Sequence, residues 1–227
     1  MKTPIRKSSS GFSIVELLIA MTIMLIALGI VSSLLSQAFA VRARESRTAD
    51  ALASAQAAIS VISREVSNSG FGLVSQSSDT ANNGIVLADS DDHRIRVRAN
   101  LENAGGTATA PGPTTLTINE PGEDVTYFFD AATSSIVRYD PNGLGTGVPQ
   151  TSVVINKISN VTFEYFDYTG GTSAATGPLT APTATTGRVR IIVEVDLDRV
   201  VGQPDNQRVT FASEVTLRNN SYMLQQY

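Results

Sequence analysis

Residues 11–31 read GFSIVELLIAMTIMLIALGIV, and this stretch decides the architecture of the chain. From Phe12 onward the run is apolar apart from two hydroxyl residues, one glycine and a single acid, Glu16. As a helix it is about 30 Å long, which matches the hydrocarbon core of a bilayer. A carboxylate at the bilayer centre costs about 3 kcal/mol on insertion scales. The sequence therefore predicts a membrane-crossing helix with one charge that needs a partner.

Composition limits the function classes that fit. The chain has 227 residues, no cysteine and a net charge of −4, enough length for one domain plus an anchor. The lack of cysteine excludes disulfides, thiolate nucleophiles and Cys-based metal sites. Without residues 1–11, which hold three basic residues and no acid, 14 basic residues remain against 21 acidic ones, or −7. That balance disfavours non-specific binding to nucleic acid or anionic lipid.

Three interpretations of the N-terminus compete. A secretory signal peptide would be cleaved after the A-x-A sequence at 38–40, which lies far beyond the apolar run. A plain anchor explains the length of the run but not Glu16. The third interpretation is a leader cut between Gly11 and Phe12 on the cytoplasmic side, where the basic residues hold the N-terminus. The cut would create a cationic amine on Phe12, about 6 Å along a helix from Glu16, and paired charges survive in lipid.

The segment from Gly11 onward resembles the type IV prepilin leader, in which a short basic leader ends in Gly and is followed by Phe, an acid at the fifth mature position and an apolar helix. The resemblance implies cleavage between Gly11 and Phe12 by a prepilin peptidase and N-methylation of Phe12. It also implies that Glu16 pairs with the N-terminal amine of an adjacent subunit. Many major pilins carry a helix-bending Pro where this chain has residues 31–33, Val-Ser-Ser.

Helical periodicity continues beyond the apolar run, so residues 12–33 and 34–69 are expected to form one helix ending near Val66. An apolar seam at spacings of three or four consists of Leu52, Ala55, Ile59, Ile62 and Val66. The sequence Ser-Asn-Ser-Gly at 67–70 is a helix stop signal.

The remaining residues, 70–227, are expected to form a β-rich domain. Period-two patterns predict strands at Gly84–Ala88, Arg94–Ala99, Thr114–Ile118, Val125–Asp130, Ile136–Tyr139, Ser152–Ile155, Val161–Tyr168, Val189–Leu197 and Val209–Leu217. The segments 125–139 and 188–217 each predict a hairpin, the second with its turn at 202–206. Residues 170–187 are of low complexity and are expected to form a long mobile surface loop. The fold class is therefore α+β, with a long N-terminal helix packed on an antiparallel sheet, which is the pilin architecture.

Three segments resemble the bodies of PilW-like minor pilins and of J-type pseudopilins of type II secretion. They are ISVISREVSNSGFG at 59–72, ISNVTFEYFDYTGG at 158–171 and ASEVTLRNNS at 212–221. The first contains Glu65 where that family usually has Asp.

Two clusters are candidates for ligand binding. Arg94, Arg96 and Arg98 alternate and so share one strand face, which could contact DNA phosphate or be a solvated face. The acids at positions 89, 91 and 92 next to His93 lack the glycine and the terminal acid of a calcium loop, so a solvated turn is expected there. Residues 143–147 are glycine-rich but lack the lysine and helix of a phosphate loop, so a turn is expected.

The expected function is that of a PilW-like minor pilin that is incorporated into, or initiates, a type IV pilus. The alternatives are a J-type pseudopilin, a pilus-displayed adhesive or DNA-binding module, or a secreted domain. The expected partners are a prepilin peptidase, other pilins or pseudopilins, and the inner membrane, with the C-terminal domain in the periplasm. The sequence contains no nucleophile motif, so neither enzyme activity nor a cofactor or metal is expected.

Overall fold

The computed structural model describes residues 11–73, 83–101, 118–168, 175–197 and 207–219. Within these residues one long helix, α1 (Ile14–Ser67), precedes a short 3-10 helix, η1 (Leu87–Asp89), and a set of strands. The strands are β1 (Arg94–Arg98), β2 (Asp124–Asp130), β3 (Ser135–Asp140), β4 (Gln150–Asn156), β5 (Asn160–Tyr168), β6 (Ala175–Leu179), β7 (Thr186–Asp196) and β8 (Arg208–Thr216). The α+β class predicted from the sequence is confirmed.

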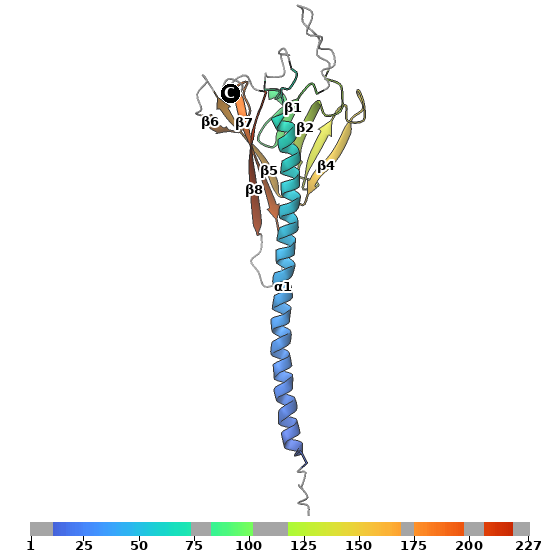
Figure 1. Cartoon of the computed structure of the whole chain (residues 1–227), viewed down its shortest axis with the longest axis vertical. Helices are drawn as coiled ribbons and strands as arrows, with labels where there is room; N and C mark the ends of the chain where they lie inside the picture. Colours follow the sequence, from blue (N-terminus) through green and yellow to red (C-terminus); the bar gives the residue numbers. More distant parts are fainter. Residues whose placement is uncertain (1–10, 74–82, 102–117, 169–174, 198–206, 220–227) are drawn as a thin grey trace, which may run out of the picture.

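Helix α1 is continuous over 54 residues and runs through the Val-Ser-Ser segment without a break. Its lower half stands free of the strands and its upper half lies against them (Figure 1). The helix ends at Ser67, next to the predicted end near Val66. Beyond it Gly70 takes a φ of +78°, which favours glycine, and its amide donates to the Arg98 carbonyl oxygen at 2.9 Å instead of continuing the helix. The Asn219 side chain donates hydrogen bonds to the carbonyl oxygens of Asn68 and Ser69 at 3.3 and 3.2 Å. These bonds satisfy acceptors just beyond the helix end.

The strands form two antiparallel sheets, with the orders β1-β2-β3-β4 and β6-β5-β7-β8. The sheets spread to either side of α1 (Figure 1), which contacts β4, β7 and β8. Both predicted hairpins are confirmed as the pairs β2–β3 and β7–β8. The turn of the second hairpin, at 202–206, lies outside the described residues.

One hydrophobic core joins the helix to both sheets. Four of the five predicted seam residues are buried in it, namely Ala55, Ile59, Ile62 and Val66. The prediction for Leu52 is wrong, because its side chain is 43% exposed. The buried stripe instead runs through Ala51, Ala55 and Ala58. Leu52 is turned about 100° away from Ala51 around the helix axis.

The predicted strand at Gly84–Ala88 is wrong, because only an isolated bridge from Ile85 to Val97 forms there. Gly84 has a φ of +79° before the bridge and η1 follows it, so the extended backbone is short. Residues 114–117 of another predicted strand lie outside the described residues, and the other seven strands are confirmed within three residues.

The long loop predicted at 170–187 is wrong for its second half. Residues 175–179 form β6, which pairs with β5, and β7 already begins at Thr186. The loop was expected because small residues and threonine carry no apolar period. The edge strand β6 is held by backbone pairing to β5, and its described side chains are mostly exposed. Residues 170–174 lie outside the described residues.

Candidate assembly site

The expected cleavage site lies in non-helical chain directly before α1. Ser13 has an extended backbone at the helix N-cap, and its carbonyl oxygen accepts the first helical hydrogen bond, from the Leu17 amide at 3.1 Å. Phe12 is 78% exposed. A Cβ built on Gly11 would meet no atom of a described residue within 4 Å, its chain neighbours aside. The peptide bond between Gly11 and Phe12 is therefore accessible to a peptidase without any unfolding of α1.

Glu16 is an exposed residue in the first turn of α1. Among the described residues it makes no ion pair and no side-chain hydrogen bond. A carboxylate in the first turn interacts favourably with the helix dipole, which contributes about 0.3–1 kcal/mol. The chain thus presents its one charge in the apolar run close to Phe12, the residue that would carry the new amine after cleavage.

The first half of α1 is apolar on all sides and exposed on all sides. The exposed large side chains run from Phe12 to Val41, and none of the described residues from 11 to 39 is even partly buried. Such a helix is stable only in hydrocarbon or among other helices. Within the described ranges, α1 is the one helix long and apolar enough to span a membrane, and its most apolar part is unburied.

The second half of α1 is held to the first sheet by a polar network at Glu65. Its carboxylate accepts hydrogen bonds from the Tyr127 hydroxyl at 2.7 Å and from the Arg138 Nε at 3.1 Å. Arg138 also reaches Asp140 at 3.4 Å. Burial first, and then the charge of Glu65, raise the pKa of Tyr127. The network fixes the rotation of α1 relative to β2 and β3, so it sets which face of the helix remains free.

The three arginines of β1 do share one face, as predicted, and it is the face away from the helix. The alternate residues Ile95 and Val97 are buried in the core. Arg96 and Arg98 both contact the Asp124 carboxylate, at 2.7 and 3.0 Å, and Arg96 also pairs with Asp89. The hydrogen bond to Asp124 raises the pKa of Arg96.

The interactions of Arg96 and Arg98 are thus largely internal to the domain, while Arg94 is exposed with its guanidinium 6.0 Å from the Phe128 ring centre. Sequence reasoning did not include Asp124, because its position opposite Arg98 follows only from the pairing of β1 with β2.

The turn before His93 is a junction between the sheets. The Asp91 carboxylate accepts a hydrogen bond from the His93 amide at 2.8 Å, and His93 Nδ1 lies 2.8 Å from the Val161 carbonyl oxygen. The Tyr165 hydroxyl donates to the Asp91 carbonyl oxygen at 2.8 Å. No group of three potential metal ligands occurs in the part of the chain that the structure describes.

The glycine-rich segment 143–147 is a turn, as expected. The Asn142 side chain accepts a hydrogen bond from the Gly147 amide at 2.8 Å, and Gly145 has a φ of +125°. Nothing in this local structure resembles a phosphate-binding loop leading into a helix.

Comparison with protein families agrees with the N-terminal geometry. The family description "Prokaryotic N-terminal methylation motif" matches residues 6–32, which include Gly11, Phe12 and Glu16. Comparisons with curated proteins and with solved structures find no match. The chain therefore carries a prepilin-type N-terminus, which supports the class of type IV pilins and pseudopilins. This motif implies processing by a prepilin peptidase and assembly with other pilins, and it suggests a structural role. The single apolar helix fits an anchor in the inner membrane.

Proposed function

We propose that this chain is a PilW-like minor pilin, cleaved between Gly11 and Phe12 and then incorporated into, or initiating, a type IV pilus. One observation supports this most strongly. The apolar half of α1 is exposed on every side, and Glu16 has no partner among the described residues. An exposed apolar helix and an unpaired carboxylate both require lipid or neighbouring helices, which one isolated subunit does not supply.

Before assembly the apolar half of α1 lies in the inner membrane. Moving it from lipid to a bundle of pilin helices gives little hydrophobic gain, because lipid tails are as apolar as leucine. Packing contacts and the pairing of Glu16 with an amine must therefore favour the bundle. An unpaired carboxylate is expensive in hydrocarbon. Pairing of Glu16 with the methylated N-terminal amine of Phe12 in a neighbouring subunit thus favours the assembled state.

The PilW-like assignment rests on the segments at 59–72, 158–171 and 212–221. In the structure these correspond to the helix end, β5 and β8, which pack together around the core. A J-type pseudopilin would present the same parts. The described contacts do not favour a DNA-binding module, because Arg96 and Arg98 are held by Asp124.

The test is the mass and N-terminal sequence of the mature protein, purified from membranes and from sheared pili. The expected terminus is N-methylated Phe12. A terminus at Val41 would indicate a secretory signal peptide, and retention of Met1 in pili would exclude processing; either result contradicts the proposal. The matched control is Gly11→Val, because a Cβ at Gly11 has no described atom within 4 Å apart from its chain neighbours. This variant should remain uncleaved in the membrane and be absent from pili.

Presence in sheared type IV pili, together with loss of piliation when the chain is deleted, distinguishes a minor pilin from a secretion pseudopilin. Normal piliation with a defect in protein secretion would instead support the J-type alternative.

A further inference from the structure

The exposed apolar side chains of the β-rich domain are concentrated at β3, β4 and the turn between them. From residue 83 onward, five large apolar side chains of the described residues are exposed, and four of these lie here, namely Tyr139, Leu144, Val148 and Val153. The segment from Tyr139 to Asn156 contains one charged residue, Asp140, and its side chain is buried. An uncharged surface with several exposed apolar side chains is typical of a contact with another protein.

The strand β4 is also an edge strand. Four regular pairs join it to β3, from Gln150 opposite Asp140 to Val153 opposite Val137, and a bulge at Val154 ends this regular stretch. Among the described residues, only β3 forms hydrogen bonds with the backbone of residues 150–153. The other side of this backbone therefore offers amide donors and carbonyl acceptors to an extended chain.

The other described edge strands of the two sheets are each protected. The backbone at 84–86 covers the outer side of β1 through two backbone hydrogen bonds, of 2.7 and 3.0 Å. The strand β6 contains Pro178, which has no amide hydrogen to donate. The strand β8 packs against α1 and carries Arg208 and Glu214 at exposed positions. Because proline and charged residues oppose pairing with another chain, β4 is the open edge among the described strands.

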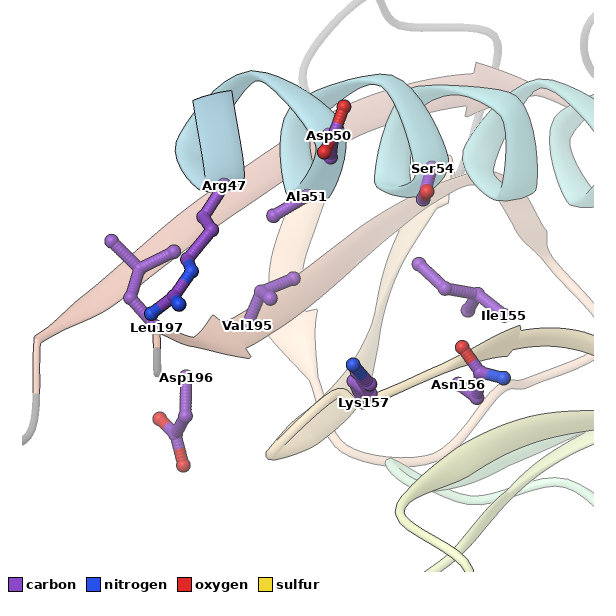
Figure 2. A pocket seen from close by; sticks show the side chains of 10 residues that line it. All are labelled: Arg47, Asp50, Ala51, Ser54, Ile155, Asn156, Lys157, Val195, Asp196 and Leu197. Atoms are coloured by element: carbon purple, nitrogen blue, oxygen red, sulfur yellow. The ribbon is translucent and has the colours of Figure 1, made fainter. Parts of the chain in front are cut away.

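The course of β4 restricts the strand that pairs with it. β4 starts near the end of α1 and runs back toward the free half of the helix (Figure 1). Its end lies against the second half of α1, where Ser54 and Ile155 line a pocket of about 280 Å³ and lie on facing sides of it in Figure 2. Antiparallel pairing of β4 with a second β4 would point the two α1 helices in opposite directions. Subunits anchored in one membrane have parallel helices, so the partner strand is not a second β4.

The base of β4 adjoins the helix through which the chain assembles. The N-terminal motif implies assembly with other pilins, and under the proposed function the apolar half of α1 packs among their helices. The strand β4 contacts the second half of the same helix. A neighbouring subunit whose helix packs beside α1 therefore has its own domain close to the free edge of β4.

We propose that the free edge of β4, residues 150–153, pairs with an edge strand from the domain of a neighbouring pilin subunit in the filament. The proposal rests on the assembly role in the proposed function and names the surface of the domain that takes part. The partner strand is antiparallel to β4 and therefore runs away from the membrane. Val148 and Val153 contact uncharged, apolar side chains of the partner, because a charge buried there would lose its water without gaining an opposite charge.

The absence of cysteine from the chain allows this contact to be tested by thiol labelling. The full-length variants Val153→Cys and, as the control, Ala212→Cys change exposed positions of β4 and β8. Each is treated with a maleimide in membranes and in sheared pili. The Val153→Cys variant should react about tenfold more slowly in pili than in membranes, because the reagent reaches a paired strand only when the pairing opens. The control should react equally in both samples. Equal labelling of the Val153→Cys variant in both samples, or equal protection of the control, would overturn the proposal.

Photo-crosslinking identifies the partner strand. Benzoylphenylalanine replaces Val153 in the full chain, sheared pili are irradiated, and the joined peptides are sequenced by mass spectrometry. The expected adduct joins β4 to an edge strand of another subunit that has a prepilin-type N-terminus. An adduct with β4 of a second copy, an adduct with a protein that lacks such an N-terminus, or the absence of any adduct would contradict the proposal.

Charges placed on the edge should block the pairing. The double variant Thr151→Lys, Val153→Lys should be incorporated into pili about tenfold less than the wild type, because pairing would bury two unpaired charges. The matched control is Thr210→Lys, Ala212→Lys, which adds the same charge at exposed positions of β8. Both double variants should unfold at the wild-type temperature in detergent micelles. Full incorporation of the β4 variant, or an equal loss in the control, would refute the contact. If the β4 variant unfolds at a lower temperature, the thiol labelling decides, because it leaves the edge uncharged.

The N-terminus of the chain in the same samples separates this proposal from the proposed function. A mature start at Phe12 with equal thiol labelling in membranes and pili refutes only the contact at β4. A start at Val41 refutes the proposed function itself.

Discussion

The hydroxyl of Tyr127 in β2 donates a 2.7 Å hydrogen bond to the carboxylate of Glu65 near the end of α1. Arg138 of β3 contacts the same carboxylate, so Glu65 adds a polar attachment of the helix to the sheet beside the hydrophobic core. Under the proposed function, the helix leaves the membrane together with its domain. The contact at Glu65 is placed where it can resist rotation or sliding of the helix against the sheet.

Replacing Glu65 with glutamine should destabilise the domain. Gln keeps the shape but removes the charge, which leaves Arg138 with Asp140 alone. Hydrogen bonds to charged groups contribute about 1.5–3 kcal/mol, so the free energy of unfolding should fall by about 2 kcal/mol. Chemical denaturation of the full chain in detergent micelles measures the change. Glu45→Gln, an exposed acid on the same helix, is the control and should have almost no effect; equal effects would exclude a specific role for Glu65.

Alkaline pH should weaken the fold. Burial raises the pKa of Tyr127 above its ordinary value of about 10, and Glu65 raises it further; burial also raises the pKa of Tyr165. The folded state therefore favours the neutral phenols, while in the unfolded chain both ionise above about pH 10. The contribution of these two tyrosines to the free energy of unfolding is fully present below that pH. As the pH rises further, the free energy of unfolding falls by about 1.4 kcal/mol per pH unit for each tyrosine.

Denaturation curves between about pH 9 and 12 check this effect. Tyr165→Phe should halve the dependence of stability on pH in this range. Tyr139→Phe, at an exposed position, should leave the dependence unchanged. An unchanged slope in the Tyr165 variant would show that burial does not control this titration.

Glu16→Ala should permit membrane insertion and cleavage but impair assembly. Removal of the carboxylate lowers the free-energy cost of placing the helix in lipid. It also removes the partner of the N-terminal amine of the neighbouring subunit. Mass spectrometry of the membrane fraction should show a normal mature terminus, while immunoblots of sheared pili should show strongly reduced incorporation. Thr22→Ala, in the same apolar run, is the control. Normal incorporation of the Glu16 variant would refute the pairing role.

Charge reversal at Arg96 should damage the fold rather than a ligand site. The Asp124 side chain is only 8% exposed, so Arg96→Glu would place like charges together at a buried carboxylate. The expected loss is about 3–5 kcal/mol in the free energy of unfolding. Arg94→Glu reverses the exposed arginine of the same strand and should leave stability nearly unchanged. Retention of DNA that drops in the Arg94 variant would support a DNA-binding face, and unchanged retention would count against it.

Several features of the fold could be predicted from local patterns. The helix and its end follow from apolar periodicity and a stop signal, and both hairpins follow from period-two runs around polar turns. These signals are local, because they depend on residues a few positions apart. The strand β6 was missed because small residues and threonine carry no such signal.

Other features depend on contacts between distant segments. The division into two sheets, the rotation that buries Ala51 and exposes Leu52, and the ion pairs that bind Arg96 all require distant segments to meet. The role of Glu65 is of the same kind, since its partners lie 62 and 73 residues away.

The N-terminal features of this protein can be read from its amino-acid order alone. The expected cleavage site, the membrane-length apolar run and its one acid are features of consecutive residues, so they can be recognised without knowledge of the tertiary structure. The pairing of the charged side chains in the domain, in contrast, depends on tertiary contacts. Among the residues that the structure describes, strand pairing brings Asp124 to Arg96 and Arg98, and packing of α1 brings Glu65 to Arg138. The reason is physical: a charge is neutralised by what lies within a few ångströms of it, and strand pairing and helix packing, not position in the chain, determine those neighbours.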